Sequence, residues 1–447
     1  MPRTRVKSSD ALGIDLDDGR VLYLPGDTIT GAVFRQQTIV SPEATVSLFF
    51  HGRTKTLFVV STGQSTVVYR GRFTLVNISQ ELFSGPLHIP KDSDKRREWK
   101  FTVKIPEKVD PSLLPPFIPH ESYLNPATVD MDAMSLPASF ISSRGSDQAF
   151  IEYYLEVKIR FQKERSWVEE TAKMPIRILA HPHPPTDPAS TSAVRIPRSI
   201  TSQRLLPGME NAHLTAGQRF KKLVGASSVP SLAFHLELDL PNEIHVDQCP
   251  VPIMMRAVPY WPSTHEALKN QPQKVRLVDF KATLESRCGI LCEGFSWAIS
   301  KTSWKQKMVL PTGGQGQAGT IEIPFSSEGP AIDIGQALDL WVESEGKNSA
   351  AFQDFTTFNI TLKHKLYWAA RLEIAQETIY FNGVQDIVIL PATDSSDAPD
   401  YIESEPLPEY ETDSSKEAVD RKGKPPSFEE AQRTEETHKK TSNSKGK

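Results

Sequence analysis

The chain has 447 residues, a length that suggests two or three domains. Its 51 Lys and Arg residues nearly balance its 55 Asp and Glu residues, which argues against a general nucleic-acid binder. Hydrophobic residues make up 38%, and no apolar run approaches the roughly 18–20 residues that span a bilayer. The first residues, Met1–Arg5, are not followed by an apolar segment, so we expect no signal peptide.

Cysteine usage points to the reducing cytosol. The three cysteines, Cys249, Cys288 and Cys292, are too few for a disulfide framework, and the first half of the chain has none. Two N-x-[ST] sequons, at Asn77 and Asn359, are therefore expected to be accidental matches that carry no carbohydrate.

Apolar and polar residues alternate in several stretches, first in Trp99–Ile105 and Ile151–Phe161, then in Phe234–Leu240 and Phe358–Trp368. Successive side chains of a strand point to opposite faces, so each stretch should bury one face and expose the other. The 35 prolines disfavour long helices. The sequence therefore predicts an all-β fold built from antiparallel sheets.

Strand patterns fill two blocks, which predict two tandem antiparallel β-sandwiches at residues 10–180 and 231–392. The stretch 181–230 begins with the histidines and prolines of His181–Pro185 and is interpreted as an extended linker and irregular segment. Turns are predicted within both blocks, at Asp18-Gly19, Pro25–Asp27, Ser84–Pro86 and Asn382-Gly383, the last as a tight hairpin.

Motifs of known enzyme classes are missing from the sequence, which has no G-x-S-x-G, P-loop or H-E-x-x-H pattern. Gly313–Gly319 lacks the Lys-Ser/Thr of a phosphate-binding loop and is interpreted as a hairpin loop. Cys288 and Cys292 are interpreted as buried thiols, and His364 as a hydrogen-bonded core histidine. We therefore expect no catalytic residue, no metal site and no cofactor, although a dispersed catalytic set stays an open alternative.

The C-terminal segment 393–447 is predicted to be a disordered tail. It holds eight acids and no Lys or Arg between residues 393 and 413, and few apolar residues throughout. Such a composition buries too little apolar surface to offset the entropy lost on folding. Three lysines of the tail, Lys416, Lys422 and Lys424, are candidate ubiquitin acceptors.

Two proline-aromatic motifs in this tail are the clearest functional signal. The first is a variant of the Pro-Pro-x-Tyr ligand of WW modules and consists of Leu407, Pro408 and Tyr410. Proline favours the extended shape that such modules bind in an aromatic groove, and the tyrosine fills a second pocket. A weaker second motif, Pro425, Pro426 and Phe428, lacks the tyrosine hydroxyl. Two motifs in one tail would gain from effective concentration.

The N-terminal block resembles the fungal arrestin-like proteins, also called α-arrestins, over about residues 10–180. The resemblance lies in an ordered series of motifs: Tyr23–Gly31, His51–Thr56, Tyr69–Arg72, Leu82–Pro86, Trp99–Pro106, Leu136–Phe140 and Ile151–Val157. Leu136–Phe140 is similar to the family's Leu-Pro-Pro-Ser-Phe with one proline replaced. The second block is matched more loosely, through its strand pattern and Thr357–His364.

This resemblance implies two arrestin-type sandwiches and an adaptor function, not an enzyme. The sandwiches would bind cytosolic tails of membrane transporters or receptors, and the tail motifs would recruit a HECT-type ubiquitin ligase through its WW modules. Ubiquitination would then direct the cargo into endocytosis or sorting. The location implied is cytoplasmic, peripherally at the plasma membrane or endosomes, without nucleic acid as a partner.

Four cations form a candidate basic strip for acidic or phosphorylated cargo: Arg53, Lys55, Arg70 and Arg72. Each pair has the i, i+2 spacing that places both side chains on one face of a strand, and guanidinium groups suit phosphate geometry. The competing interpretation is a solvated outer face of a sheet. For the whole chain, the alternatives are a ligase-independent trafficking scaffold similar to a retromer subunit, and an unrecognised enzyme on a β-sandwich.

Overall fold

The protein is an all-β chain, as the alternation predicted. The computed structural model describes residues 11–20, 22–61, 63, 65–90, 96–113, 122–124, 134–180, 191–210, 212, 229–246, 250–293, 299–310, 321–342 and 353–391. Within these residues the helical segments are short: η1 (Pro111–Leu113), η3 (Gln203–Leu205), η4 (Trp261–Ser263), η5 (Glu266–Leu268) and α2 (Ile334–Leu338).

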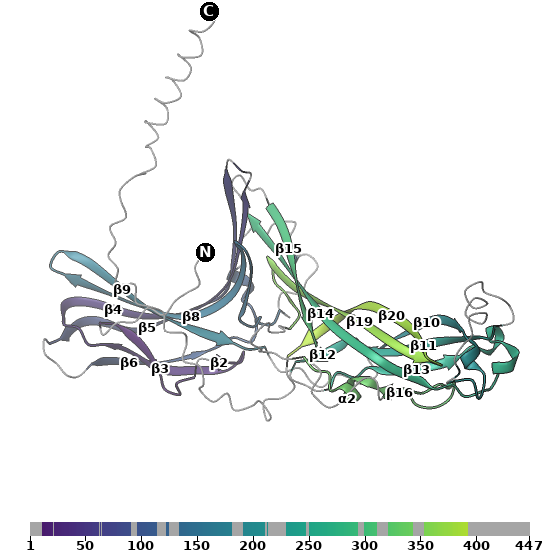
Figure 1. Ribbon diagram of the computed structural model, residues 1–447. Helices are drawn as coiled ribbons and strands as arrows, with labels where there is room; N and C mark the ends of the chain where they lie inside the picture. The colour runs from purple at the N-terminus through teal and green to yellow at the C-terminus, as the bar shows by residue number, and fades with distance from the viewer. Residues whose placement is uncertain are drawn as a thin grey trace, which may run out of the picture. The chain divides into compact units, whose positions relative to one another are not determined.

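The strands of the first half belong to two sheets (Figure 1). A three-stranded sheet has the order β1-β3-β6, with β1 (Gly13–Leu16), β3 (Thr28–Arg35) and β6 (Arg97–Lys104). The larger sheet contributes β2 (Leu22–Tyr23), β4 (Ile39–Ser61), β5 (Thr66–Ile89), β7 (Phe140–Arg144), β8 (Asp147–Lys163) and β9 (Ser166–Ile178).

The second half adds a four-stranded sheet and continues the large one. The small sheet has the order β10-β11-β13-β17, with β10 (Thr191–Thr201), β11 (Ser231–Pro241), β13 (Met254–Pro259) and β17 (Ile332–Asp333). The large sheet also takes in β12 (Glu243–His245), β14 (Val275–Glu293), β15 (Ile299–Val309), β16 (Ile321–Ile323), β18 (Phe355–Thr356), β19 (Ile360–Ile374) and β20 (Glu377–Leu390). Its main path runs β12-β20-β19-β14-β5-β4-β8-β9-β2.

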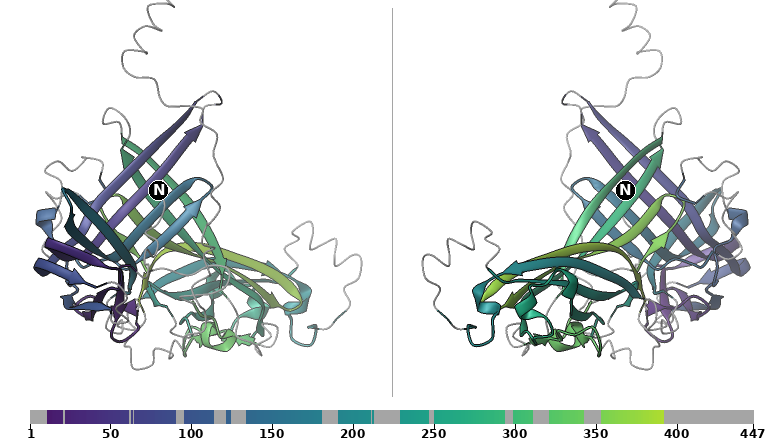
Figure 2. Two further views of the ribbon diagram at one scale, coloured as in Figure 1. Left: turned by 90° about the vertical axis from the view of Figure 1, so that its left-hand side faces the viewer. Right: turned by 90° about the vertical axis from the view of Figure 1, so that its right-hand side faces the viewer.

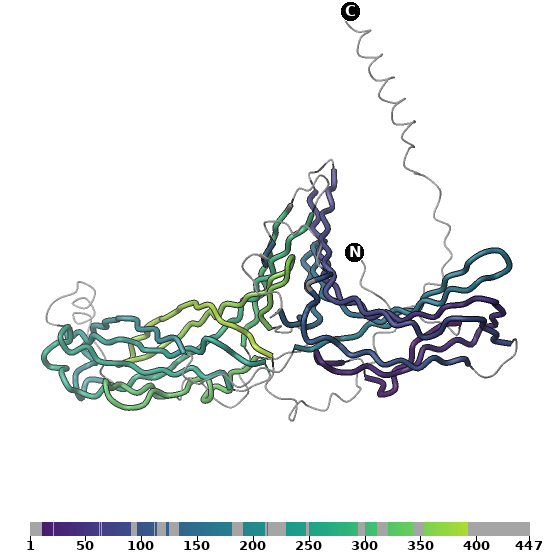
Figure 3. Tube along the Cα trace, turned by 180° about the vertical axis from the view of Figure 1, so that it is seen from behind, coloured from purple at the N-terminus to yellow at the C-terminus, as the bar shows by residue number. Residues whose placement is uncertain are grey.

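Two hydrophobic cores fill the spaces between these sheets. The first core packs the three-stranded sheet against β4, β5, β8 and β9, which appear as the purple-to-blue layers of Figure 3. The second core packs the four-stranded sheet against β14, β19 and β20, through residues such as Phe234, Met255 and Trp368. Buried and exposed positions alternate along β6, β11 and β19, so the faces predicted for these strands are confirmed.

The two halves share one of these cores. Six residues of the second half belong to the first core: Cys288, Ile290, Cys292, Trp304, Ile360 and Leu362. The hairpins β4–β5 and β14–β15 meet through one ladder pair, Arg70 with Glu293, and both can be followed in Figure 2. Residues up to Ser396 accordingly form one compact unit.

The interpretation of residues 181–230 as an irregular linker is wrong for Thr191–Thr201. This segment is β10, which pairs with β11 along its whole length. Val194 and Ile196 pack against the second core, and Pro197 is tolerated because β10 is an edge strand, where a missing N–H costs no ladder bond. The proline and serine content hid a strand that tertiary packing stabilises.

The hairpin predicted at Asn382-Gly383 is also wrong. Both residues lie inside β20, opposite Ala369 and Trp368 of β19. A Cβ on Gly383 would approach the Trp368 ring to 2.7 Å, so the glycine makes room for the indole. The turn between β19 and β20 is formed instead by Ala375 and Gln376, which both have positive φ, 50° and 62°. Neither residue type signals such a turn.

Several smaller predictions are confirmed. His364 is buried, and its Nδ1 lies 2.6 Å from Asp354 Oδ1. At Pro25–Asp27 the chain turns, with Asp27 Oδ2 accepting a hydrogen bond from the Leu24 N–H. The predicted loop Gly313–Gly319, the segment His181–Pro185, Cys249 and the entire tail lie outside the described residues.

Candidate functional site

The two tail motifs lie outside the described residues. This applies to Leu407, Pro408 and Tyr410, to Pro425, Pro426 and Phe428, and to the three tail lysines. Ligase recruitment by these residues stays a prediction from the sequence.

The outer face of β4 and β8 differs from the expected solvated face. The alternation in Ile151–Phe161 predicted that Glu152, Tyr154 and Glu156 would be exposed, yet their exposed fractions are 9%, 4% and 8%. Long side chains of β4 and β9 cover them and form ion pairs with the two buried carboxylates. The prediction of a wetted face is therefore wrong for this part of β8.

Two members of the predicted basic strip, Arg53 and Lys55, are bound to Glu152. The β4–β8 register places Arg53 directly opposite Glu152. Arg53 Nε donates to Glu152 Oε1 at 2.8 Å, and Lys55 Nζ forms an ion pair with the same oxygen. All three side chains are at most 14% exposed. Burial lowers the pKa of Lys55, although the Glu152 carboxylate opposes this effect. These two cations thus already share a carboxylate within the protein.

A second network lies beside it on the same face. Lys173 Nζ lies 2.9 Å from one Glu156 oxygen, and His51 Nε2 lies 3.2 Å from the other. Burial raises the pKa of Glu156, but the hydrogen bond from Lys173 and the neighbouring cations outweigh it, so the pKa is lowered overall. The Tyr154 ring lies between Arg53 and Lys173, at 4.8 Å and 5.4 Å from its centroid. These pairings explain how charged side chains are accommodated with little solvent exposure.

The other two members of the predicted strip, Arg70 and Arg72, are exposed. Arg72 lies opposite Lys55, and Arg70 lies opposite both Leu57 and Glu293. Within the described residues neither arginine is in an ion pair. The structure therefore divides the predicted strip into a pair bound to Glu152 and a pair whose guanidinium groups are available to an anion.

A nearby row of cations on β15 was missed by the sequence reasoning. Lys301, Lys305 and Lys307 are exposed and share one face of this strand, and Lys301 lies opposite Leu291, next to Glu293. Lys305 and Lys307 both pair with the buried Glu285, at 2.7 Å and 3.5 Å. The signal that could have revealed this row is the even spacing of Lys301, Lys305 and Lys307, which places all three on one face of a strand.

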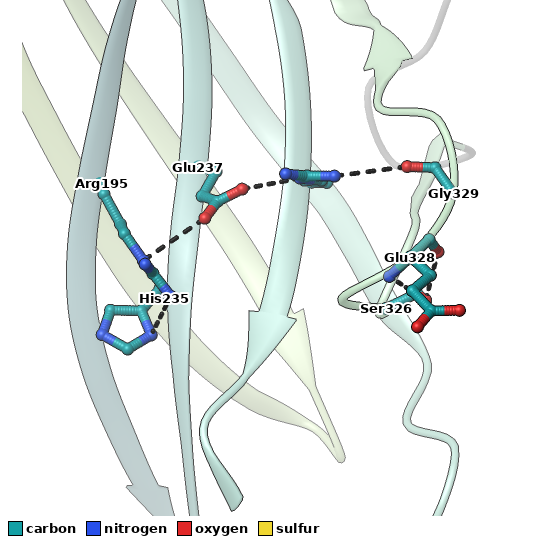
Figure 4. Close-up of polar contacts among 7 residues, drawn as sticks. Arg195, His235, Glu237, Ser326, Glu328 and Gly329 are labelled. Atoms are coloured by element: carbon teal, nitrogen blue, oxygen red, sulfur yellow. Dashed lines mark hydrogen bonds and ion pairs between the residues drawn. The ribbon is translucent and has the colours of Figure 1, made fainter.

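A third group of charged side chains lies on the outer face of the four-stranded sheet, where two arginines share one carboxylate (Figure 4). Glu237 lies between two arginines, 3.3 Å from Arg195 Nε and 2.7 Å from Arg256 Nε. Arg256 Nη1 also donates to the carbonyl of Gly329 at 3.3 Å, and an Arg195 nitrogen lies 3.4 Å from His235 Nδ1. These contacts connect β10, β11, β13 and the loop at Gly329, so the two arginines stabilise the fold.

Groups that could carry chemistry are dispersed over the described part of the chain. No set of three or more His, Cys, Asp or Glu side chains there is placed to hold a metal ion. Cys288 and Cys292 are buried as predicted, and burial raises the pKa of their thiols to about 12 and about 11. Among the described residues, no helix combines the length and the apolar character needed to cross a membrane.

Comparison with known proteins adds no relative. No model of a known protein family matches the chain, and a search of the curated proteins returned no match.

Proposed function

We propose that the chain is an arrestin-like adaptor that binds cytosolic segments of membrane transporters or receptors and recruits a HECT-type ubiquitin ligase. The observation that carries the cargo half of this proposal is the exposed pair Arg70 and Arg72 beside β14. Guanidinium groups without an internal carboxylate partner can form bidentate hydrogen bonds with phosphate or carboxylate groups of a partner. Arg53 and Lys55, which are bound to Glu152, drop out of the proposed cargo strip.

Lys301 extends the proposed strip from β5 to β15. Arg70 and Lys301 lie on the two sides of the end of β14, where Glu293 is the nearest opposing charge in the ladder. The strip would thus bind an acidic segment of the cargo through cations supplied by both halves of the chain. A segment of this kind carries several negative charges within a short extended stretch.

The cargo half is tested by the affinity of the full chain for a phosphoserine-containing acidic peptide. We expect Arg70→Glu/Arg72→Glu to weaken binding by roughly tenfold or more, since each reversal replaces attraction by repulsion. A matched control is Lys100→Glu/Lys104→Glu, which reverses two exposed cations on β6. Equal binding by the strip variant and the parent would remove the cargo strip from the proposal.

The ligase half is tested by a pull-down with isolated WW modules. We expect Tyr410→Ala to abolish most of the binding, because the tyrosine side chain fills the second pocket of the module. Tyr401→Ala in the same tail is the matched control and should bind like the parent. If the parent itself binds no WW module, the ligase-independent scaffold is the better proposal.

A further inference from the structure

The hairpin between β8 and β9 ends in an exposed tryptophan surrounded by cations. Trp167 is 45% exposed and lies opposite Gln162, with the Arg160 guanidinium carbon 4.5 Å from its ring centroid. Lys163 directly precedes the turn, Arg165 lies in it, and both are also exposed. A large aromatic side chain at a hairpin end contributes little to a core, which indicates a role for Trp167 other than core packing.

Positive charge dominates this end of the hairpin. Its cations are Lys158, Arg160, Lys163 and Arg165, and none of the four is in an ion pair within the described residues. Two carboxylates oppose them: Glu164 in the turn, and Glu169, which lies opposite Arg160. The turn and its flanks therefore carry more cations than carboxylates, although Lys158 also interacts electrostatically with Glu156.

A second exposed apolar residue lies near the turn end of this hairpin. Val40, at the start of β4, is 71% exposed. Its neighbour Ser41 accepts a hydrogen bond from the Gln162 N–H at 3.1 Å, and Gln162 is the residue opposite Trp167. Thus two of the exposed large hydrophobic side chains of the protein, on β4 and β9, lie on the two sides of the end of β8.

We propose that this β8–β9 end docks on an anionic lipid bilayer, with Trp167 in the interface and the surrounding cations on lipid phosphates. Tryptophan favours the bilayer interface, and each Lys or Arg near an anionic membrane adds to the attraction. A peptide ligand would need a groove, whereas two cavities found among the described residues are lined by other segments, Lys104–Lys108 and residues around Asp15 and Arg96. The proposal goes beyond the adaptor function, because it uses none of the cargo-strip or tail residues.

The experiment is sedimentation of the full chain with phosphatidylcholine vesicles, prepared with and without phosphatidylserine. We expect stronger binding to the phosphatidylserine vesicles, and a loss of roughly tenfold or more in Arg160→Glu/Arg165→Glu, because each reversal removes an attraction and adds a repulsion. Trp167→Ser should weaken binding several-fold. Glu164→Asn should tighten it, since asparagine tolerates the positive φ of 56° at this position and removes a negative charge.

Matched controls separate this docking from general surface effects. Tyr380→Ser removes another exposed aromatic side chain, from β20, and Lys100→Glu reverses an exposed cation on β6; both should bind vesicles like the parent. Thermal unfolding of each variant verifies that the fold is intact. Vesicle binding that is insensitive to Trp167→Ser and to the charge reversal would overturn the proposal, and so would displacement of the vesicles by the acidic phosphopeptide. Retained vesicle binding by Arg70→Glu/Arg72→Glu would support the membrane-docking proposal, because it would show that vesicle binding does not depend on the cargo strip.

Discussion

Thr54 Oγ1 donates a hydrogen bond of 2.7 Å to Asn359 Oδ1, across 305 positions of sequence. Both residues are fully buried, and Asn359 Nδ2 donates in turn to Thr56 Oγ1 at 3.3 Å. Thr56 Oγ1 donates to the carbonyl of Leu291 at 2.7 Å. This neutral network joins β4 to the second half where the first core is shared. It also means that the Asn359 sequon is inaccessible to glycosylation in the folded protein.

Removing the amide at this junction should destabilise the protein. Asn359→Ala leaves the hydroxyls of Thr54 and Thr56 without their partner in a buried site, which should cost about 1–3 kcal/mol of unfolding free energy. Urea unfolding of the variant and the parent measures the difference. Asn77→Ala, at an exposed position of β5, is the control and should change stability by less than about 0.5 kcal/mol. If both variants unfolded like the parent, the junction would not depend on this network.

The ion pair between Arg35 and Glu170 ties the three-stranded sheet to β9. Arg35 is 1% exposed and donates through both terminal nitrogens to the Glu170 oxygens, at 2.6 Å and 3.1 Å. Glu170→Ala would leave a buried guanidinium without its partner, so we expect a loss of about 3–5 kcal/mol. Glu169→Ala, the neighbouring acid on the outer face, is the control. Chemical denaturation should separate the two variants clearly, and equal midpoints would contradict this account of the pair.

The Trp368 indole packs directly on Gly383, so this position has no room for a side chain. Gly383→Ala would place a Cβ against the Trp368 indole, and relief of that contact by a shift of strand or ring should cost about 1–3 kcal/mol. Asn382→Ala changes the adjacent, exposed position of the same strand and should be nearly neutral. Thermal unfolding measures both. An unchanged melting temperature in Gly383→Ala would indicate that the indole moves freely.

The protein should lose stability as the pH falls, partly through protonation of His51. Burial lowers the pKa of this imidazole below its usual 6.5, although Glu156 opposes the shift. As the pH falls through 6.5, the unfolded chain binds the proton more readily than the folded chain, so the free energy of unfolding decreases. His51→Phe keeps a ring between Phe49 and Tyr154 and removes this titration.

Unfolding measured between about pH 7.5 and 5.5, the range in which histidine titrates, should therefore show a smaller loss of stability in His51→Phe than in the parent. Asn77→Ala, at the position opposite His51 on β5, should keep the slope of the parent. A slope in His51→Phe equal to that of the parent would contradict the assignment of this pH dependence to His51.

The sequence by itself determined what local periodicity controls. Alternation identified the strands and the core face of β6, β11 and β19, because side-chain direction in a strand follows directly from position. It also predicted that His364 and the two thiols are buried, His364 because it shares the apolar strand face of Leu362 and Leu366. The tail motifs stay a prediction from the sequence, one that depends only on local sequence because a WW ligand would be recognised in a linear, extended form.

The tertiary structure decided which cations are available and where the turns fall. Arg53 and Lys55 are bound to a carboxylate because the register of β4 and β8 places Glu152, about a hundred positions away, opposite Arg53. Asn382-Gly383 is a strong turn signal that is overruled by the need to pack Trp368, so the turn moves to Ala375 and Gln376. Ion pairs and packing between distant strands depend on register, and register is set by the whole sheet and not by any single segment.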